Sequence, residues 1–416
     1  MSVTANGIRV ITEAMPRMRS VSAGCWIGTG SRAESAAESG IAHFIEHMLF
    51  KGTSDRNAGQ IAREMDALGG ELDAFTDREE ACFSVKVLDE QLGVAFPILA
   101  DMLVHPKFDA AEIDKEKGVI LEEMKAENDD PESVVHDLFL AQLWPGAALS
   151  RPIIGTKRTI ARFGREAVRR YHERHYTGAN LTVSAAGSLR HEEVVELVER
   201  HLGALPAGEA VQPEAAPAAR AARALKRKQS LEQVQLCVGT PFCRAAHEWR
   251  YAAYAMNTLL GGSMSSRLFQ NIREERGLAY SIYSELNLFA DAGCLAVYAG
   301  TAPDKAGEVV ELILAQLDRL RREPVGEEEL RRTREHLKAS LLLGLESTGS
   351  RMSNLARQWL IYGRFYTMDE LSAAVDAVTS EQIQHLARTY FQSDGIALAA
   401  VGRTDALARA QGALVC

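Results

Sequence analysis

The sequence predicts an α+β protein made of two homologous α/β sandwich domains, each with an antiparallel-rich mixed sheet and packed helices. The chain has 416 residues, too many for one ordinary core, since domains usually hold about 100–200 residues. Apolar residues alternate with polar ones over residues 82–87, and they recur at helical spacing over residues 61–68 and 309–320. Short hairpin-like strands mixed with long helices favour this layered class over a parallel doubly wound sheet.

Each element follows from its own residues. Ile61, Met65 and Leu68 share one face of the first expected helix, and the glycine pair at residues 69–70 ends it. A strand is expected around residues 71–88, and within residues 82–87 three apolar residues alternate with the others, as on a half-buried strand: Phe83, Val85 and Val87. A second amphipathic helix is expected in the other half, with this apolar face: Val309, Leu312, Ile313, Leu317 and Leu320.

The two halves resemble distant copies of one unit, which predicts a duplication. Gly28-Thr29 corresponds to Gly239-Thr240, 211 residues further on, and a helical stretch follows each pair. The strand around residues 71–88 corresponds to one around residues 279–298.

The segment between the halves, residues 206–226, is rich in Ala and Pro and has little apolar periodicity. It therefore predicts a linker between a domain at residues 1–205 and a domain at residues 227–416.

Composition and charge narrow the functional class. The net charge of −9 gives no support to a nucleic-acid partner. The N-terminus lacks the pattern of a signal peptide, and no run of about 18 apolar residues predicts a membrane span. The six cysteines are scattered, and four lie in apolar, strand-like stretches: Cys25, Cys82, Cys237 and Cys294. Buried thiols in a reducing compartment, and hence a cytoplasmic location, are the expectation.

Residues 43–47, HFIEH, carry the strongest chemical signal. On a helix His43 and His47 are one turn apart on the same face, so both imidazoles can reach one Zn²⁺. Glu46 shares that face and can take a proton from water activated by the metal. This order of residues is the inverted zinc-peptidase signature. The alternative is two ordinary histidines on one helix, against which the apolar flanks of the motif argue.

A catalytic zinc needs a third protein ligand, and residues 116–124 offer candidates. Val119, Ile120 and Met124 predict a helix with one buried side. Glu123 follows Glu116 by two turns, so both glutamates lie on one face. The spacing alone leaves Glu122 and Glu123 open as the ligand, and ordinary solvated acids remain the alternative.

These motifs resemble the pitrilysin or insulinase-like zinc metallopeptidases, family M16, over nearly the whole chain. The closest likeness is to bacterial members similar to the mitochondrial processing peptidase β subunit. HFIEH at residues 43–47 matches the family's zinc helix, and MLFKGT after it is also typical. The resemblance implies one Zn²⁺ per chain, with Glu123 as the third ligand and Glu116 as a supporting glutamate.

Two further segments match the family. Residues 70–76, GELDAFT, resemble the active-site edge strand, which implies that Ala74, Phe75 and Thr76 pair with an extended substrate peptide. Asp73 departs from the Asn that many relatives have. Residues 265–281 match the C-terminal signature, which implies that Arg273 and Tyr280 contact the substrate and its carbonyl near the metal.

The second half carries no second zinc motif. The positions 210 residues after His43, Glu46 and His47 hold these residues instead: Ala253, Met256 and Asn257. His172 and His175 are expected at an exposed helix end rather than in a second metal site.

We expect a zinc-dependent endopeptidase that hydrolyses peptides or unfolded, presequence-like segments bound in extended form, with Glu46 as general base. The principal alternative is a non-catalytic, structural core-subunit-like relative in a larger assembly. A third class is a module that binds metal or peptide without cleavage. Since one chain carries both the zinc motif and the Arg/Tyr pair, a homodimer is expected, with a heterodimer with a related subunit as the alternative.

Overall fold

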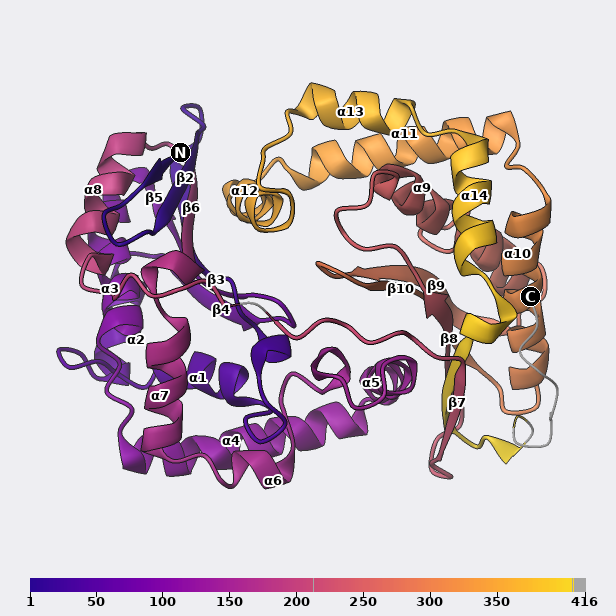
Figure 1. Cartoon of the computed structure of the whole chain (residues 1–416), viewed down its shortest axis with the longest axis horizontal. Coiled ribbons are helices and arrows are strands. Elements are labelled where there is room, and N and C mark those ends of the chain that lie inside the picture. Colours follow the sequence, from indigo (N-terminus) through magenta and orange to yellow (C-terminus); the bar gives the residue numbers. More distant parts are fainter. Residues whose placement is uncertain (212, 406, 408–416) are drawn as a thin grey trace. The chain divides into compact units, whose positions relative to one another are not determined.

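A computed structural model describes residues 1–211, 213–405 and 407 of the chain. The chain folds into two compact units, each assembled from three stretches of sequence (Figure 1). The first unit comprises Met1–Lys125, Arg151–Glu214 and Gly344–Phe365. The second comprises Ala126–Ser150, Ala215–Leu343 and Tyr366–Cys416. The units thus exchange short segments, which a single cut in the sequence cannot describe.

The first unit is built on a six-stranded sheet in the order β1-β2-β6-β3-β5-β4. Its strands are β1 (Ser2–Val3), β2 (Arg9–Ala14), β3 (Ser20–Ile27), β4 (Glu71–Thr76), β5 (Ala81–Leu88) and β6 (Leu181–Gly187). Strands β2 and β6 run parallel, and the other neighbours are antiparallel. Strand β4 ends the sheet, so one side of its backbone pairs with β5 and the other is an edge.

Helices cover one face of this sheet and enclose the main core of the unit. They are α1 (Ile41–Leu49), α2 (Ala58–Ala67), α3 (Leu92–Val104), α4 (Ala110–Asp129), α7 (Arg165–His175) and α8 (His191–Leu202), with the short α6 (Lys157–Ile160) between them. Strand period decides which side chains enter this core. Phe83, Val85 and Val87 of β5 do so, as their alternation predicted.

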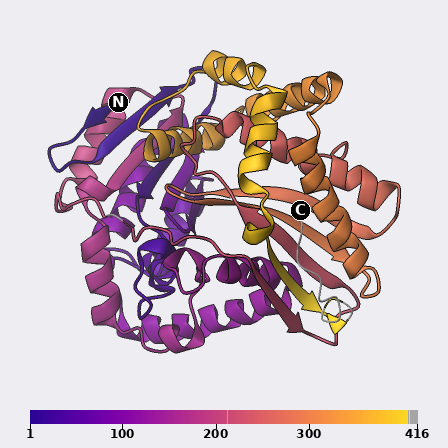
Figure 2. The same cartoon turned by 45° about the vertical axis from the view of Figure 1, so that its right-hand side comes forward.

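The opposite face of the first sheet is covered by α12 (Thr348–Tyr362), which comes from far along the sequence (Figure 2). Met352 and Ala356 of α12 pack against Trp26 of β3 and Cys82 of β5. The Thr348 and Ser22 hydroxyls lie 2.9 Å apart beneath the helix. The segment therefore belongs to this core by packing, although it lies in the second half of the chain.

The second unit repeats the arrangement with a five-stranded sheet, β7-β11-β8-β10-β9. Its strands are β7 (Ala222–Arg227), β8 (Val234–Pro241), β9 (Ala279–Leu288), β10 (Gly293–Thr301) and β11 (Ala397–Gly402). Strands β7 and β11 run parallel and the rest antiparallel, as in the first sheet without its β1. Shared strand order and direction support the predicted duplication, and the α+β sandwich class is confirmed.

Within the described residues, helices enclose the core on one face of the second sheet. They are α9 (Arg250–Leu260), α10 (Ala306–Arg322), α11 (Glu327–Gly344), α13 (Met368–Asp376) and α14 (Ser380–Tyr390). The other face receives α5 (Pro131–Leu143) from the first half of the sequence. Phe139 of α5 is buried there, and a side chain at Gly239 of β8 would meet its ring at 2.8 Å. Each sheet thus receives one helix from the other half of the chain.

Several expectations need correction. The single strands expected around residues 71–88 and 279–298 are two hairpins, β4-β5 and β9-β10, because charged residues 77–80 and the segment 289–292 form turns. The predicted linker ends inside β7, whose backbone pairs with β11. The division into residues 1–205 and 227–416 leaves out the exchange of α5 and α12. Among the described residues, no helix has the length and apolar character needed to cross a membrane.

The cysteines follow their apolar surroundings. Cys25, Cys82, Cys237 and Cys294 are buried in β3, β5, β8 and β10, as expected for strand positions. Burial raises the pKa of each of the first three thiols, since an ion would lose its hydration there. Cys416 lies outside the described residues.

Removing the ring of Phe139 should destabilise the second unit. Phe139→Ala leaves a cavity between α5 and the sheet, so the free energy of unfolding should fall by about 3–5 kcal/mol. The exposed Val119 supplies a control, and Val119→Ala should change stability by less than about 0.5 kcal/mol. Urea unfolding followed by circular dichroism measures both. Equal effects of the two variants would contradict the packing of α5 described above.

Candidate metal centre

Helix α1 presents the motif residues because its other side is committed to the core. Ile41, Phe44, Ile45, Met48 and Leu49 are buried. His43, Glu46 and His47 lie on the remaining, half-buried face. The helical period of 3.6 residues separates the two sets, so burial of the apolar set fixes the direction in which the imidazoles point.

Helix α4 supplies the carboxylates in the same way. Its buried line contains Ile113, Glu116, Ile120 and Met124, spaced three or four residues apart. Glu123 stands at the margin of this line and is half-buried. Glu122 is exposed and pairs with Lys125 in the next turn. The period of α4 thus turns Glu123 toward α1 and Glu122 away from it.

Three possible ligand atoms converge between the two helices. His43 Nε2 lies 3.7 Å from Glu123 Oε1, and His47 Nε2 lies 3.6 Å from Glu123 Oε2. One ligand atom from each of these residues lies within 4.8 Å of the others. The imidazole centroids of His43 and His47 are 4.6 Å apart.

These atoms fit a zinc ion better than they fit one another. The separations exceed a hydrogen bond, and Glu123 Oε2 is shielded from solvent with no hydrogen-bond partner. Donors about 2.1 Å from one tetrahedral ion lie about 3.4 Å apart, close to the distances found. Two imidazoles and a carboxylate are also the ligand types of a catalytic zinc site. His43, His47 and Glu123 could therefore hold Zn²⁺.

Glu116 orients His47 from behind. His47 Nδ1 lies 2.8 Å from Glu116 Oε1, and Lys51 Nζ lies 2.7 Å from Glu116 Oε2. Burial alone would raise the pKa of Glu116, but these two partners hold it below its ordinary value. A carboxylate on Nδ1 leaves Nε2 of the imidazole to face a metal, and this arrangement is common around metal-binding histidines.

The two histidines differ electrostatically. Burial, with a smaller effect of His47, lowers the pKa of His43 to about 4, so its imidazole is neutral at pH 7. Burial also acts to lower the pKa of His47, but the hydrogen bond to Glu116 and the charges of Glu123, Glu116 and Glu46 raise it overall. Several carboxylates thus favour positive charge at this point, as a cation-binding site requires.

Glu46 is held by the neighbouring strand. Thr76 Oγ1, on the edge strand β4, donates to Glu46 Oε2 at 2.6 Å. Burial raises the pKa of Glu46, and the Thr76 bond opposes that rise. A raised carboxyl pKa suits a group that must both accept and return a proton. Thr76 was expected to contact substrate through its strand; its bond to Glu46 has no signal in the sequence, because it joins segments 30 residues apart.

Sequence comparison agrees with the geometry. A family profile described as Insulinase (Peptidase family M16) matches residues 9–157, and one described as Peptidase M16 inactive domain matches residues 162–337. A Bacillus subtilis (strain 168) protein named Uncharacterized zinc protease YmxG is 41% identical over 390 residues, covering 94% of this chain and 95% of its own. The chain belongs to peptidase family M16. A Rickettsia felis protein, also named an uncharacterized zinc protease, is 33% identical over 396 residues, 94% of this chain and 95% of its own.

Solved structures share the fold at low identity. A peptidase M16 inactive domain from Pseudomonas fluorescens superposes with a TM-score of 0.91 at 19% identity, over 97% of this chain and 98% of that one. A protease from Helicobacter pylori gives 0.89 at 21% identity, over 96% and 98%. A chain of complex III2 from Candida albicans gives 0.84 at 20% identity, over 98% and 96%. These likenesses concern the fold.

Beside the candidate centre of this M16 chain runs β4, the segment expected to bind substrate. Strand β4 contacts α1 and ends the sheet, as an active-site edge strand should. Ala74 pairs with Phe83 and Phe75 with Cys82 on β5. The Phe75 ring meets Trp26 edge-on at 5.6 Å and lies under the Arg357 guanidinium. Asp73 is exposed and pairs with Ser84 of β5 in the ladder, and its side chain makes no hydrogen bond within the part of the chain that the structure describes.

Arg273 and Tyr280 lie in the second unit, whereas the zinc-binding candidates lie in the first. Arg273 belongs to a π-helical turn, Phe269–Glu274, and Tyr280 is the second residue of β9. The Arg273 guanidinium sits over both the Phe269 ring and the Tyr280 ring, with 5.3 Å to the latter. Tyr280 is 78% exposed, so its ring and hydroxyl are accessible to a ligand.

The expectation for His172 and His175 is wrong. Both are buried on α7 rather than exposed. The His172 ring stacks on Tyr176, and its Nε2 lies 2.9 Å from the Leu103 carbonyl oxygen. Burial lowers the pKa of both histidines to about 4. Both are core histidines. The charged residues around them in the sequence had suggested an exposed helix end.

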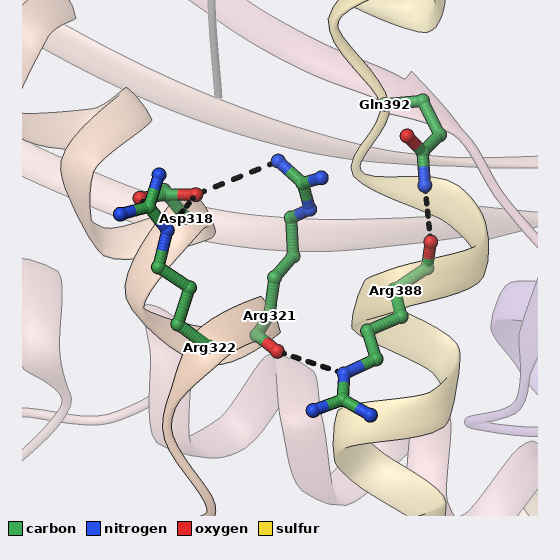
Figure 3. A pocket seen from close by; sticks show the side chains of 5 residues that line it. All are labelled: Asp318, Arg321, Arg322, Arg388 and Gln392. Atoms are coloured by element: carbon green, nitrogen blue, oxygen red, sulfur yellow. Dashed lines mark hydrogen bonds and ion pairs between the residues drawn. The ribbon is translucent and has the colours of Figure 1, made fainter.

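A basic pocket in the second unit has a structural explanation (Figure 3). It lies where α10 and α14 end and encloses about 650 Å³. Asp318 pairs with Arg321 and Arg322, and Arg388 Nε donates to the Arg321 carbonyl oxygen at 3.1 Å. Arginines at helix C-termini stabilise the helix dipole and its last carbonyl groups. Within this pocket the arginines therefore serve the helix ends.

The choice between the two adjacent glutamates can be tested with isosteric amides. Loss of a residue that holds a metal ligand in place typically weakens metal binding by about 10–100-fold. Glu123→Gln should weaken zinc binding by more than this, because a charged ligand becomes a neutral one. Glu122→Gln, its matched neighbour, should leave the affinity unchanged. Competition with a chromogenic chelator measures both. Stronger loss in the Glu122 variant would move the third ligand to that residue.

Proposed function

We propose that this M16 chain is a zinc-dependent endopeptidase that hydrolyses peptides or unfolded, presequence-like segments bound in extended form. One observation carries the proposal: two imidazoles and a carboxylate converge while Glu46 lies on the same face of α1, next to an edge strand. A metal-storage site would need the three ligands but neither the fourth residue nor the strand.

The parts divide the work. His43, His47 and Glu123 would hold one Zn²⁺, and Glu116 with Lys51 would keep His47 oriented. Bound zinc supplies Lewis acidity, which polarises a peptide carbonyl and lowers the pKa of water toward about 7. Since Thr76 already occupies Oε2 of Glu46, the proton from the attacking water would be taken at Oε1 and later returned to the leaving amine.

Substrate binding follows from the edge of the first sheet. The outer side of β4 offers backbone groups to an extended peptide, which would add a strand at Ala74, Phe75 and Thr76. Backbone pairing requires an unfolded segment but depends little on the amino-acid sequence of that segment. Specificity for particular substrates would come from side-chain contacts.

Arg273 and Tyr280 are proposed to bind the substrate backbone and the carbonyl oxygen. Support comes from the match of residues 265–281 to the family's C-terminal signature and from the exposure of Tyr280. The stacked guanidinium limits the motion of the tyrosine ring, so the pair is partly organised before a ligand arrives.

The alternative is a non-catalytic relative. The fold does not separate the two readings, since it is shared with a peptidase M16 inactive domain and with a chain of complex III2. The retained residues favour the enzyme, because a scaffold needs neither a half-buried glutamate beside two histidines nor a shielded Glu123 Oε2 without a hydrogen-bond partner. Near-stoichiometric zinc with peptide cleavage would support the enzyme, whereas zinc without cleavage of any peptide in a random library would favour a metal-binding module.

Glu46→Gln separates catalysis from metal binding. The amide keeps the shape of the side chain but cannot accept the proton, so kcat should fall by at least about 10²–10⁴-fold. Zinc content by atomic absorption should stay at the level of the unchanged protein, because Glu46 is not one of the three ligands. Glu122→Gln is the control for an exposed glutamate of the same unit. Full peptidase activity in the Glu46 variant would refute the mechanism.

We further propose that two chains associate as a homodimer, because one chain carries both the zinc motif and the Arg/Tyr pair. Sedimentation velocity across a concentration series, with peptidase activity measured on the same samples, tests this. A dimer whose dissociation lowers activity is expected. A fully active monomer at all concentrations would contradict the proposal.

A further inference from the structure

Helix α1 begins without a capping side chain of its own. Its N-cap is Gly40, in a left-handed conformation with φ +93°, and a glycine has no side chain that could accept a hydrogen bond from the first turn. The first amide groups of a helix have no partner within the helix. They must therefore find acceptors elsewhere. Because α1 has only nine residues, disorder in its first turn would affect a large part of the helix.

Position 40 cannot carry the cap because another backbone lies against it. A Cβ atom there would come within 2.7 Å of the Ile154 carbonyl oxygen and 2.8 Å of Gly155 Cα. The approach is mutual, since a Cβ atom at Gly155 would meet the Ser39 carbonyl oxygen at 2.4 Å. Both residues have positive φ, so the start of α1 accepts only glycine at this crossing.

Glu34 supplies the missing acceptors. The Gly40 amide donates to its Oε2 at 2.8 Å, and the Ala42 amide donates to its Oε1 at 2.9 Å. The Ile41 amide between them donates to the Glu38 carbonyl oxygen at 2.9 Å. Glu34 is only 3% exposed, and the Arg151 guanidinium donates to its backbone carbonyl oxygen. The carboxylate is thus buried, accepts two backbone hydrogen bonds and lies at the positive end of the helix dipole.

We propose that Glu34 is a positioning residue of the zinc site: by fixing the first turn of α1 it holds His43 and His47 at the angle that meets Glu123. His43 directly follows Ala42, whose amide Glu34 binds, so movement of that turn would displace one ligand at once. The inference rests on the proposed function for the identity of the metal, whereas the contacts of Glu34 are independent of it.

The neighbouring acid provides a contrast within the same loop. Glu38 accepts from the Ser35 hydroxyl at 2.8 Å and pairs with Arg174 at 2.9 Å, and its side chain makes no bond to an amide of α1. Burial raises the pKa of Glu34 to about 8, while the bonds from Ala42 and Gly40 and the Arg151 charge act in the opposite direction. Both of its oxygens accept N–H bonds, which stabilise the ionised form against the effect of burial.

The test compares Glu34→Gln with Glu38→Gln in the full-length protein. An amide at position 34 turns one acceptor into a donor that faces an N–H group. Zinc affinity, measured by chelator competition, should fall by about tenfold in the Glu34 variant and stay unchanged in the Glu38 variant. The visible spectrum of the Co²⁺-substituted protein should change in the Glu34 variant alone, and kcat should fall with little change in KM. Unchanged affinity and spectrum in a folded Glu34 variant would overturn the proposal.

Hydrogen exchange of the unmodified protein tests the contacts without any substitution. The Gly40 and Ala42 amides should exchange as slowly as amides inside α1, although both lie at its first turn. Exchange at the rate of exposed loop amides would overturn the proposal even if the Glu34 variant fails to fold. A protein that binds zinc but cleaves no peptide would remove the proposed function and leave this inference standing.

Discussion

The candidate centre depends on the burial of two helices. α1 and α4 each commit an apolar line to the core of the first unit, and that burial turns the polar residues of both helices toward a common point. A carboxylate and two imidazoles then face one another at distances too long for hydrogen bonds. Such a convergence is costly unless a cation joins it, because buried polar atoms without partners destabilise a protein. The core therefore organises the site before any ligand is present.

Around this convergence a second set of contacts limits the freedom of each group. Glu116 and Lys51 fix His47, Thr76 fixes Glu46, and Glu34 satisfies the first turn of α1. Each contact comes from a different segment: α4, the turn after α1, the edge strand β4 and the loop before α1. Groups that are held from several directions keep their geometry when a ligand binds, and positioned groups of this kind are what the proposed catalysis requires. Strand β4 makes two contributions, since Thr76 restrains Glu46 and the outer side of the strand leaves backbone groups at the edge of the sheet.

The duplication explains the asymmetry between the units. Both sheets have the same strand order around the parallel pair, and each is completed by a helix from the other half of the chain. In the second unit α9 stands where α1 stands in the first, yet its corresponding positions are Ala253, Met256 and Asn257. With no imidazole or carboxylate to orient, that helix buries both alanine and methionine in its core. The first unit thus carries the candidate metal-binding residues, and the second has apolar packing at two of the three corresponding positions.

By itself the sequence determined what local spacing controls. The helical period placed His43, Glu46 and His47 on one face, and the strand period identified the core side of β5. Contacts between distant segments lay outside its reach, because spacing carries no information about which faces meet. Only the tertiary structure showed that Glu123 rather than Glu122 faces α1 and that His172 is buried. It also placed α5 in the second unit and α12 in the first, each apart from its own half of the sequence. Those outcomes follow from the burial of apolar surface across the whole fold, which no single segment encodes.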